Sequence, residues 1–206
     1  MKKYTKLILA PHADDDVLGC GGILDSDCFV VYCGLDESGI QGRPSQEERV
    51  REIEDVVAVT RHGFEILENP VNQYAKCNLI SDFERVINDH EPLEVYVCHP
   101  SYNQDHKEVY DAAMVALRPH DKNYFVGRIF VYEQPHMLFW DNGGVDFKPN
   151  YFVPIDVEKK VKVYTLMESQ VRSFRGPDHV RAISKLRGGQ SNCEYAEAFQ
   201  VLRWVK

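Results

Sequence analysis

The sequence predicts one α/β domain built on a mainly parallel β-sheet. The 206 residues contain no internal repeat and no low-complexity linker, so we expect a single domain over residues 1–206. The first two thirds alternate short β-rich runs with helical patterns, which is typical of strand–helix–strand crossovers between parallel strands. The last third breaks this alternation, and we expect it to decorate one end of the sheet.

Local patterns predict each element in turn. The apolar run "KLILA" (Lys6–Ala10) predicts a buried strand, and a helix follows it from near Asp15. Residues 28–33, "CFVVYC", predict the second strand. Ser45 and Glu48 have the spacing of a capping box and predict the start of a helix. We expect this helix to end at Gly63. The elements that follow are, in chain order, a helix at 79–90, a strand at 93–98, a helix at 106–118, apolar runs at 127–133 and 151–155, helices at 157–171 and near 179–186, and a segment at 195–203.

Charge and composition exclude several kinds of partner. The net charge of −8 argues against binding along a phosphate backbone, which requires clustered lysine and arginine, so we expect no nucleic-acid partner. No apolar run reaches the roughly 18 residues of a membrane span, so no integral membrane segment is expected. The start "MKKYTKLILAPHADDD" lacks the cleavage region of a signal peptide, and the six cysteines form no CxxC pair. Both features favour a cytoplasmic location with reduced thiols.

Two polar motifs follow two of the expected strands. His12, Asp14 and Asp15 come directly after the first strand, and His106 follows the strand at 93–98. Ligands bind at the carboxyl ends of parallel strands, so these side chains are candidates for one site. His12 and Asp15 are three residues apart at a helix start and face the same way, and His106 completes a two-histidine, one-carboxylate set typical of catalytic zinc. Asp14 is placed to act as a general base, and a cation would offset the repulsion among the consecutive aspartates.

These motifs resemble those of the LmbE/PIG-L-type zinc-dependent de-N-acetylases. The first motif of that family is matched by "PHADDDVLGCGG", in which Ala13 and Asp16 replace a usual proline and glutamate. The resemblance extends over nearly the whole chain. Further matches are Asp105-His106, the pair Arg51 and Glu54 ahead of Gly63, and the tail residues Ser169-Gln170, Arg187-Gly188 and 195–199.

The resemblance implies a fold, a metal and a reaction. The fold is a Rossmann-like three-layer sandwich. Zinc, or another divalent metal, is held by His12, Asp15 and His106, with Asp14 as the base. The reaction is the hydrolysis of an N-acetyl group on a small amino sugar or sugar conjugate of the N-acetylglucosamine type, and Arg51 is implied as a substrate contact.

One position departs from the family pattern. Asn103 stands where several members have a histidine that stabilises the oxyanion or protonates the amine. An asparagine amide can donate to an oxyanion but cannot deliver a proton at neutral pH, so Asp14, His99 and His136 are left as candidate acids. His99 is also a candidate substrate contact. Asp105 either caps its helix or orients a neighbouring metal ligand, and the sequence leaves both roles open.

Three classes of function are open at this point. The first is zinc-dependent deacetylation of an amino sugar or its conjugate. The second keeps the metal but cleaves another bond, as in another amidase or a phosphoesterase. The third is a sugar- or nucleotide-binding module with a degenerate site. Related proteins often assemble, so a homo-oligomer is compatible with each class.

Overall fold

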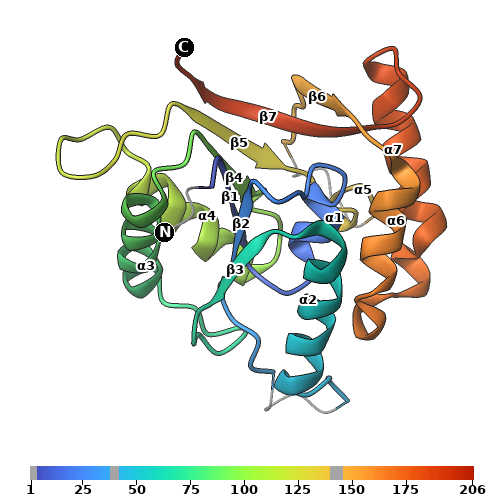
Figure 1. Cartoon of the computed structure of the whole chain (residues 1–206), viewed down its shortest axis with the longest axis horizontal. Helices are drawn as coiled ribbons and strands as arrows, with labels where there is room; N and C mark the ends of the chain where they lie inside the picture. Colours follow the sequence, from blue (N-terminus) through green and yellow to red (C-terminus); the bar gives the residue numbers. More distant parts are fainter. Residues whose placement is uncertain (1–3, 38–41, 140–145) are drawn as a thin grey trace.

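The computed structural model describes residues 4–37, 42–139 and 146–206, which form a seven-stranded sheet flanked by helices (Figure 1). The strands are β1 (Lys6–Ala10), β2 (Cys28–Tyr32), β3 (Gly63–Ile66), β4 (Glu94–Cys98), β5 (Arg128–Tyr132), β6 (Tyr151–Pro154) and β7 (Ala196–Trp204). The helices are α1 (Asp15–Cys20), α2 (Gln46–Thr60), α3 (Lys76–His90), α4 (Gln104–Ala116), α5 (His136–Phe139), α6 (Val157–Thr165) and α7 (Pro177–Gln190), with 3-10 turns η1 (Glu168–Gln170) and η2 (Ser173–Arg175).

The strand order of the sheet is β3-β2-β1-β4-β5-β7-β6. The strands from β3 to β5 are parallel to one another, whereas β7 is antiparallel to both β5 and β6. Strands β1 and β2 are apolar along almost their whole length because both of their faces are covered. The chain passes from β1 to β2 and β3 on one side and then returns to β4 on the other. The carboxyl ends of β1 and β4 therefore meet at the switch point, where ligands bind in such sheets.

Helices cover both faces of the sheet and complete a three-layer arrangement (Figure 1). On one face α3 packs against α4, and on the other α6 contacts α1, α2 and α7. The α/β fold class with a mainly parallel sheet, predicted from the alternation of elements, is confirmed. The last third extends the sheet with β7 and β6 and covers one face with α6 and α7. None of the helices in the described ranges is both long enough and apolar enough to cross a bilayer.

The end of α2 differs from the sequence-based prediction. The helix stops at Thr60, Arg61 adopts a left-handed conformation with φ of 63°, and Gly63 begins β3. A Cβ atom at Gly63 would lie 2.3 Å from the hydroxyl oxygen of Tyr4, so close packing requires glycine here. The sequence does not predict β3, because its four residues are only half-buried and form no continuous apolar run.

The helix expected at 157–171 is shorter in the structure. It ends at Thr165, and the chain continues into the two 3-10 turns. Ser169 anchors this segment, because its backbone N–H and its hydroxyl donate to the two carboxylate oxygens of Glu52 at 2.6 and 2.7 Å. The two bonds hold residues 168–175 beside α2, where they form a wall of the cavity described next.

Candidate active site

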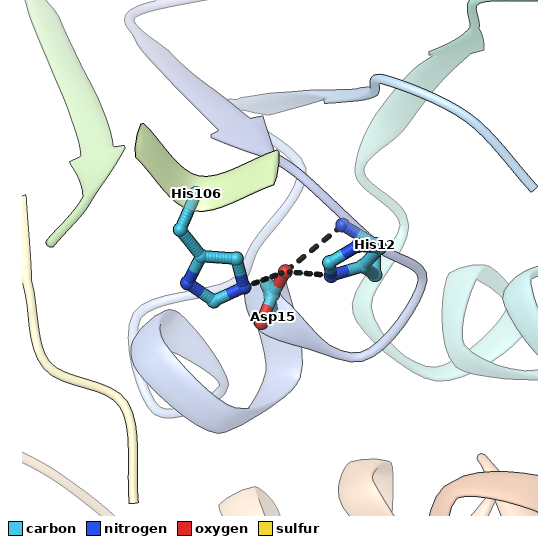
Figure 2. A group of neighbouring side chains, drawn as sticks. All are labelled: His12, Asp15 and His106. Carbon is cyan, nitrogen blue, oxygen red and sulfur yellow. Dashed lines mark hydrogen bonds and ion pairs between the residues drawn. The ribbon is translucent and has the colours of Figure 1, made fainter. Parts of the chain in front are cut away.

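Three side chains from two distant parts of the chain converge at the carboxyl ends of β1 and β4 (Figure 2). His12 lies in the turn after β1, Asp15 begins α1, and His106 lies in the first turn of α4. The Oδ2 atom of Asp15 is 3.2 Å from His12 Nδ1 and 3.3 Å from His106 Nε2. One ligand atom from each residue lies within 4.8 Å of the other two. Two imidazole nitrogens and one carboxylate oxygen suit zinc or a similar divalent ion and leave a coordination position open.

The charges around His12 provide a place for a cation. Its Nδ1 faces Asp15, and its Nε2 lies 2.9 Å from Asp105 Oδ2. Burial lowers the pKa of His12, but the hydrogen bonds to Asp105 and Asp15 outweigh burial and raise the pKa to about 10. The metal-free imidazole therefore carries a proton between two carboxylates. A divalent ion beside Nδ1 supplies positive charge in place of that proton, so the donor set fits a metal.

Asp105 supports His12 from the side away from the other two candidate ligands. It is 1% exposed, and its Oδ2 also accepts the backbone N–H of Asn72 at 2.8 Å. The cap of α4 comes from Asn103 instead, whose Oδ1 accepts the backbone N–H of Asp105 at 2.8 Å. The sequence leaves two roles open for Asp105, and its contact with His12 favours the orientation of a metal ligand over helix capping.

The three consecutive aspartates have three different sets of partners. Asp14 Oδ2 lies 2.7 Å from Arg175 Nη2, and Asp15 faces the two histidines. Asp16 is fully buried and accepts the Tyr32 hydroxyl at 2.8 Å. Burial raises the pKa of Asp16 to about 7, so this carboxyl holds a proton part of the time near neutrality and adds less than a full charge to the site.

An open cavity of about 540 Å³ adjoins the three candidate ligands. Asp14 lines it together with Asn103 and His136, and the ring of His136 is 5.4 Å from that of His106. Because the Oδ1 of Asn103 is engaged in the helix cap, its amide nitrogen is the group left to donate to a substrate oxygen. Burial lowers the pKa of His136 to about 4, so its imidazole is neutral near pH 7, which disfavours it as a proton donor.

Arg51 and His99 are not among the described residues that line this cavity. Arg51 is exposed on α2, and its Nε donates to the Glu47 carbonyl of the same helix. His99 is 9% exposed, and its ring lies against Phe147 with the ring centroids 5.8 Å apart. The arrangement therefore gives no support to either residue as a substrate contact.

Arg49 and Glu52 take the place that the sequence-based interpretation gave to Arg51 and Glu54. Arg49 lines the cavity, and both it and Glu52 are buried, whereas Arg51 and Glu54 are exposed. Both pairs have the same spacing of three residues, so spacing alone does not separate them. The position on the helix separates the two pairs, because Arg49 shares a helix face with the buried Ile53, four residues further along.

Residues 170–175 form a wall of the cavity that the sequence does not predict. Arg172, Phe174 and Arg175 line it, and Arg175 pairs with Asp14. The stretch "QVRSFR" has no recognisable ligand spacing. These side chains reach the cavity because the 3-10 turns are anchored on α2, which is a long-range contact.

Comparison with known proteins gives matches at the level of structure. No family model and no curated protein matches the chain. A 4-carboxy-2-hydroxymuconate hydratase from Pseudomonas putida is 17% identical with a TM-score of 0.75, over 100% of this chain and 99% of that chain. An N,N'-diacetylchitobiose deacetylase from Pyrococcus horikoshii is 19% identical with a TM-score of 0.76, over 96% and 83%. A teicoplanin deacetylase in a zinc-inhibited form is 16% identical with a TM-score of 0.73, over 96% and 98%.

At these identities the similarity shows that the chain shares its fold with these enzymes. Both a hydratase and deacetylases have this fold, so the fold alone does not select a reaction. The choice depends on the chemistry that the chain's own side chains can perform at the carboxyl ends of β1 and β4.

Proposed function

We propose that this protein is a hydrolase of the LmbE/PIG-L type that uses a divalent metal, such as zinc, to remove an N-acetyl group from an amino sugar or sugar conjugate. The observation that carries the proposal is the convergence of His12 Nδ1, Asp15 Oδ2 and His106 Nε2 on one point beside Asp14. A metal bound there supplies a Lewis acid and makes water a stronger nucleophile near neutral pH.

The residues around the metal position have separate tasks. Asp105 accepts the Nε2–H of His12 at 2.9 Å, which leaves His12 Nδ1 as the metal-binding nitrogen and fixes the ring. Burial of Asp15 and His106, at 3% and 2% exposure, excludes bulk water from two of the three ligands.

Asp14 is the general base of the proposed reaction. It is 4% exposed, it lines the cavity, and Arg175 holds one of its carboxylate oxygens at 2.7 Å. The carboxylate accepts a proton from water as the water attacks the acetamide carbon. When the carbon–nitrogen bond breaks, the same carboxyl returns the proton to the departing amine, and acetate is the second product. In this proposal the amide nitrogen of Asn103, which lines the same cavity, donates to the carbonyl oxygen as its negative charge develops.

The fold accommodates this reaction, and the set of candidate ligands beside Asp14 is what favours it over the alternatives. Two of the three structures named above are deacetylases, an N,N'-diacetylchitobiose deacetylase and a teicoplanin deacetylase, and the second was solved in a zinc-inhibited form. A phosphoesterase with two metals needs a larger ligand set than the three residues that the described part of the chain brings together.

Acetate release tests the proposal. Metal-loaded protein is incubated with N-acetylglucosamine and several of its glycosides, and acetate is measured before and after chelation. We expect acetate release that is lost on chelation and restored by added metal. In Asp14→Asn the rate should fall at least about 100-fold while the bound metal stays unchanged, because only the base is removed.

The matched control is Asp111→Asn, which removes a carboxylate from an exposed position of α4 and should leave the rate unchanged. A protein that releases no acetate from any substrate, or that releases phosphate from phosphate esters instead, contradicts the deacetylase assignment. An Asp14→Asn protein that keeps most of its activity contradicts the role of Asp14.

A further inference from the structure

Arginine is concentrated around one cavity of an acidic protein. The chain has a net charge of −8, yet the described lining of the cavity contains four arginines and three carboxylates. The arginines come from two walls. Arg43 and Arg49 belong to the start of α2 and the turn before it, and Arg172 and Arg175 belong to the segment after α6.

Two of these arginines are paired with carboxylates inside the protein. Arg175 pairs with Asp14 at 2.7 Å, and Arg49 pairs with Glu37 at 3.1 Å. Among the residues that the structure describes, Arg43 has only the same Glu37 carboxylate as a charged partner, at 3.8 Å, and its side chain is 39% exposed. One carboxylate therefore faces two guanidinium groups, and Arg43 keeps most of its capacity to bind an anion.

Arg172 has no carboxylate partner within the described residues. It is half-buried in the cavity wall, near Phe174, which also lines the cavity and is 57% exposed. A half-buried guanidinium is less fully solvated than an exposed one, so an anion that approaches it gains more than it would in open water. The planar group can also donate two parallel hydrogen bonds to a carboxylate or a phosphate.

We infer that Arg172 and Arg43 form a subsite for an anionic group, so that the substrate is an N-acetylated amino-sugar conjugate that carries a phosphate or a carboxylate. This rests on the proposed deacetylase function of the neighbouring metal site. Both arginines line the cavity that also holds Asp14, so a substrate bound beside Asp14 can extend toward them. The exposed rings of Phe174 and Tyr102, at 57% and 54%, offer apolar contact to the sugar between them.

The first test compares three substrates on the metal-loaded protein. Methyl N-acetylglucosaminide is neutral, N-acetylglucosamine 1-phosphate carries a phosphate, and the carboxymethyl glycoside of N-acetylglucosamine carries a carboxylate. We expect kcat/KM at least tenfold higher for one or both charged substrates, and the comparison between them identifies the anion. This preference should fall as salt rises from 50 to 300 mM, because screening weakens a partly exposed contact.

Variants assign the preference to the subsite. Arg172→Ala should lower kcat/KM for the charged substrate at least tenfold, mainly through KM, and change the neutral substrate less than twofold. Arg172→Lys should retain part of the preference, because it keeps the charge but loses the planar fork. Arg118→Ala is the matched control: it removes an exposed arginine at the end of α4, outside the described lining, and should change neither substrate.

A binding measurement separates the subsite from the reaction. Calorimetry with glucosamine 1-phosphate and methyl glucosaminide is carried out on the wild type and on Arg172→Ala, each with metal and after chelation. The subsite is supported if the wild type binds glucosamine 1-phosphate more tightly than methyl glucosaminide and Arg172→Ala does not. This holds even if no acetate is released in the first test. Equal affinity of the wild type for the two ligands overturns the subsite. A preference for the phosphate that persists in Arg172→Ala and vanishes on chelation also overturns it, because the metal then binds the phosphate. Acetate release with no preference for charge leaves the deacetylase function standing and overturns the subsite.

Discussion

Replacement of Asp105 by asparagine isolates the effect of a buried charge on the proposed metal site. The Asp105 side chain is 1% exposed, and its Oδ2 accepts hydrogen bonds from His12 Nε2 at 2.9 Å and from the Asn72 backbone at 2.8 Å. Asparagine has the same shape, and its amide oxygen in the same place can accept both bonds. The substitution therefore removes a negative charge with almost no change in volume.

The expected magnitude follows from the strength of one hydrogen bond. A hydrogen bond to a charged acceptor contributes about 1.5–3 kcal/mol and a neutral one about 0.5–1.5 kcal/mol, so the His12 bond weakens by roughly 1–1.5 kcal/mol. This bond fixes the ring and keeps a proton on Nε2, so Nδ1 is the nitrogen that gives up its proton to the metal. At 1.4 kcal/mol for each tenfold change, metal affinity should fall roughly 5- to 12-fold.

A competition titration measures this change. Chelator-stripped wild type, Asp105→Asn and the control Asp111→Asn are titrated with zinc at pH 7.5 in the presence of a chromophoric chelator, and thermal melting confirms that each protein is folded. Asp111 lies on the same helix, but its side chain is 52% exposed. Zinc affinity of Asp105→Asn within twofold of the wild type refutes the reasoning. An equal loss in Asp111→Asn refutes it as well, because the loss would then reflect net charge rather than the contact with His12.

Two further predictions concern folding stability. His62 is buried, and burial lowers its pKa from 6.5 to about 4, so only the unfolded chain takes up the proton as the pH first drops below 6.5. The contribution of the neutral His62 to folding stability is therefore complete above pH 6.5, and it is lost as the pH falls toward 4. Urea unfolding measures the free energy of unfolding at pH 7.5 and at pH 5. The decrease between the two should be about 2 kcal/mol larger in the wild type than in His62→Gln, and equal decreases contradict this. Gly19→Ala places a Cβ 2.2 Å from Tyr132 Cδ2 and should cost about 1–3 kcal/mol of unfolding free energy. The control Gly189→Ala, which meets nothing within 4 Å, should be neutral or stabilise by up to about 1 kcal/mol, and a similar loss in both variants contradicts the packing argument.

The parts of the fold that the sequence predicts are those in which burial is visible as a local pattern. Strands β1, β2 and β4 are short apolar runs covered on both faces. Strand β3 has no such signal, because all four of its residues are half-buried. The end of α6 is not visible either, since the helical pattern continues to Met167 while the contact between Ser169 and Glu52 turns the chain.

The same distinction holds at the candidate site. The spacing of His12 and Asp15 is local, and the rule that ligands bind at strand ends links them to His106 across the sheet. The choice between Arg49 and Arg51 is not a matter of spacing, because each has a glutamate three residues later. It depends on the phase of the helix, since residues two apart point to nearly opposite faces.

The stretch "DDD" shows why a local reading of this site stays incomplete. Three adjacent carboxylates at low exposure are unfavourable unless each finds a compensating group. The compensating groups come from distant places: the guanidinium of Arg175 lies beyond α6, the imidazole of His106 lies after β4, and the hydroxyl of Tyr32 ends β2. The three contacts also separate the chemistry of the carboxyl groups, because one pairs with an arginine, one pairs with histidines and one holds a proton part of the time near neutral pH. Three identical residues in sequence thus become a base, a ligand and a structural hydrogen-bonding group in the proposed mechanism, and the difference among them resides entirely in the tertiary structure.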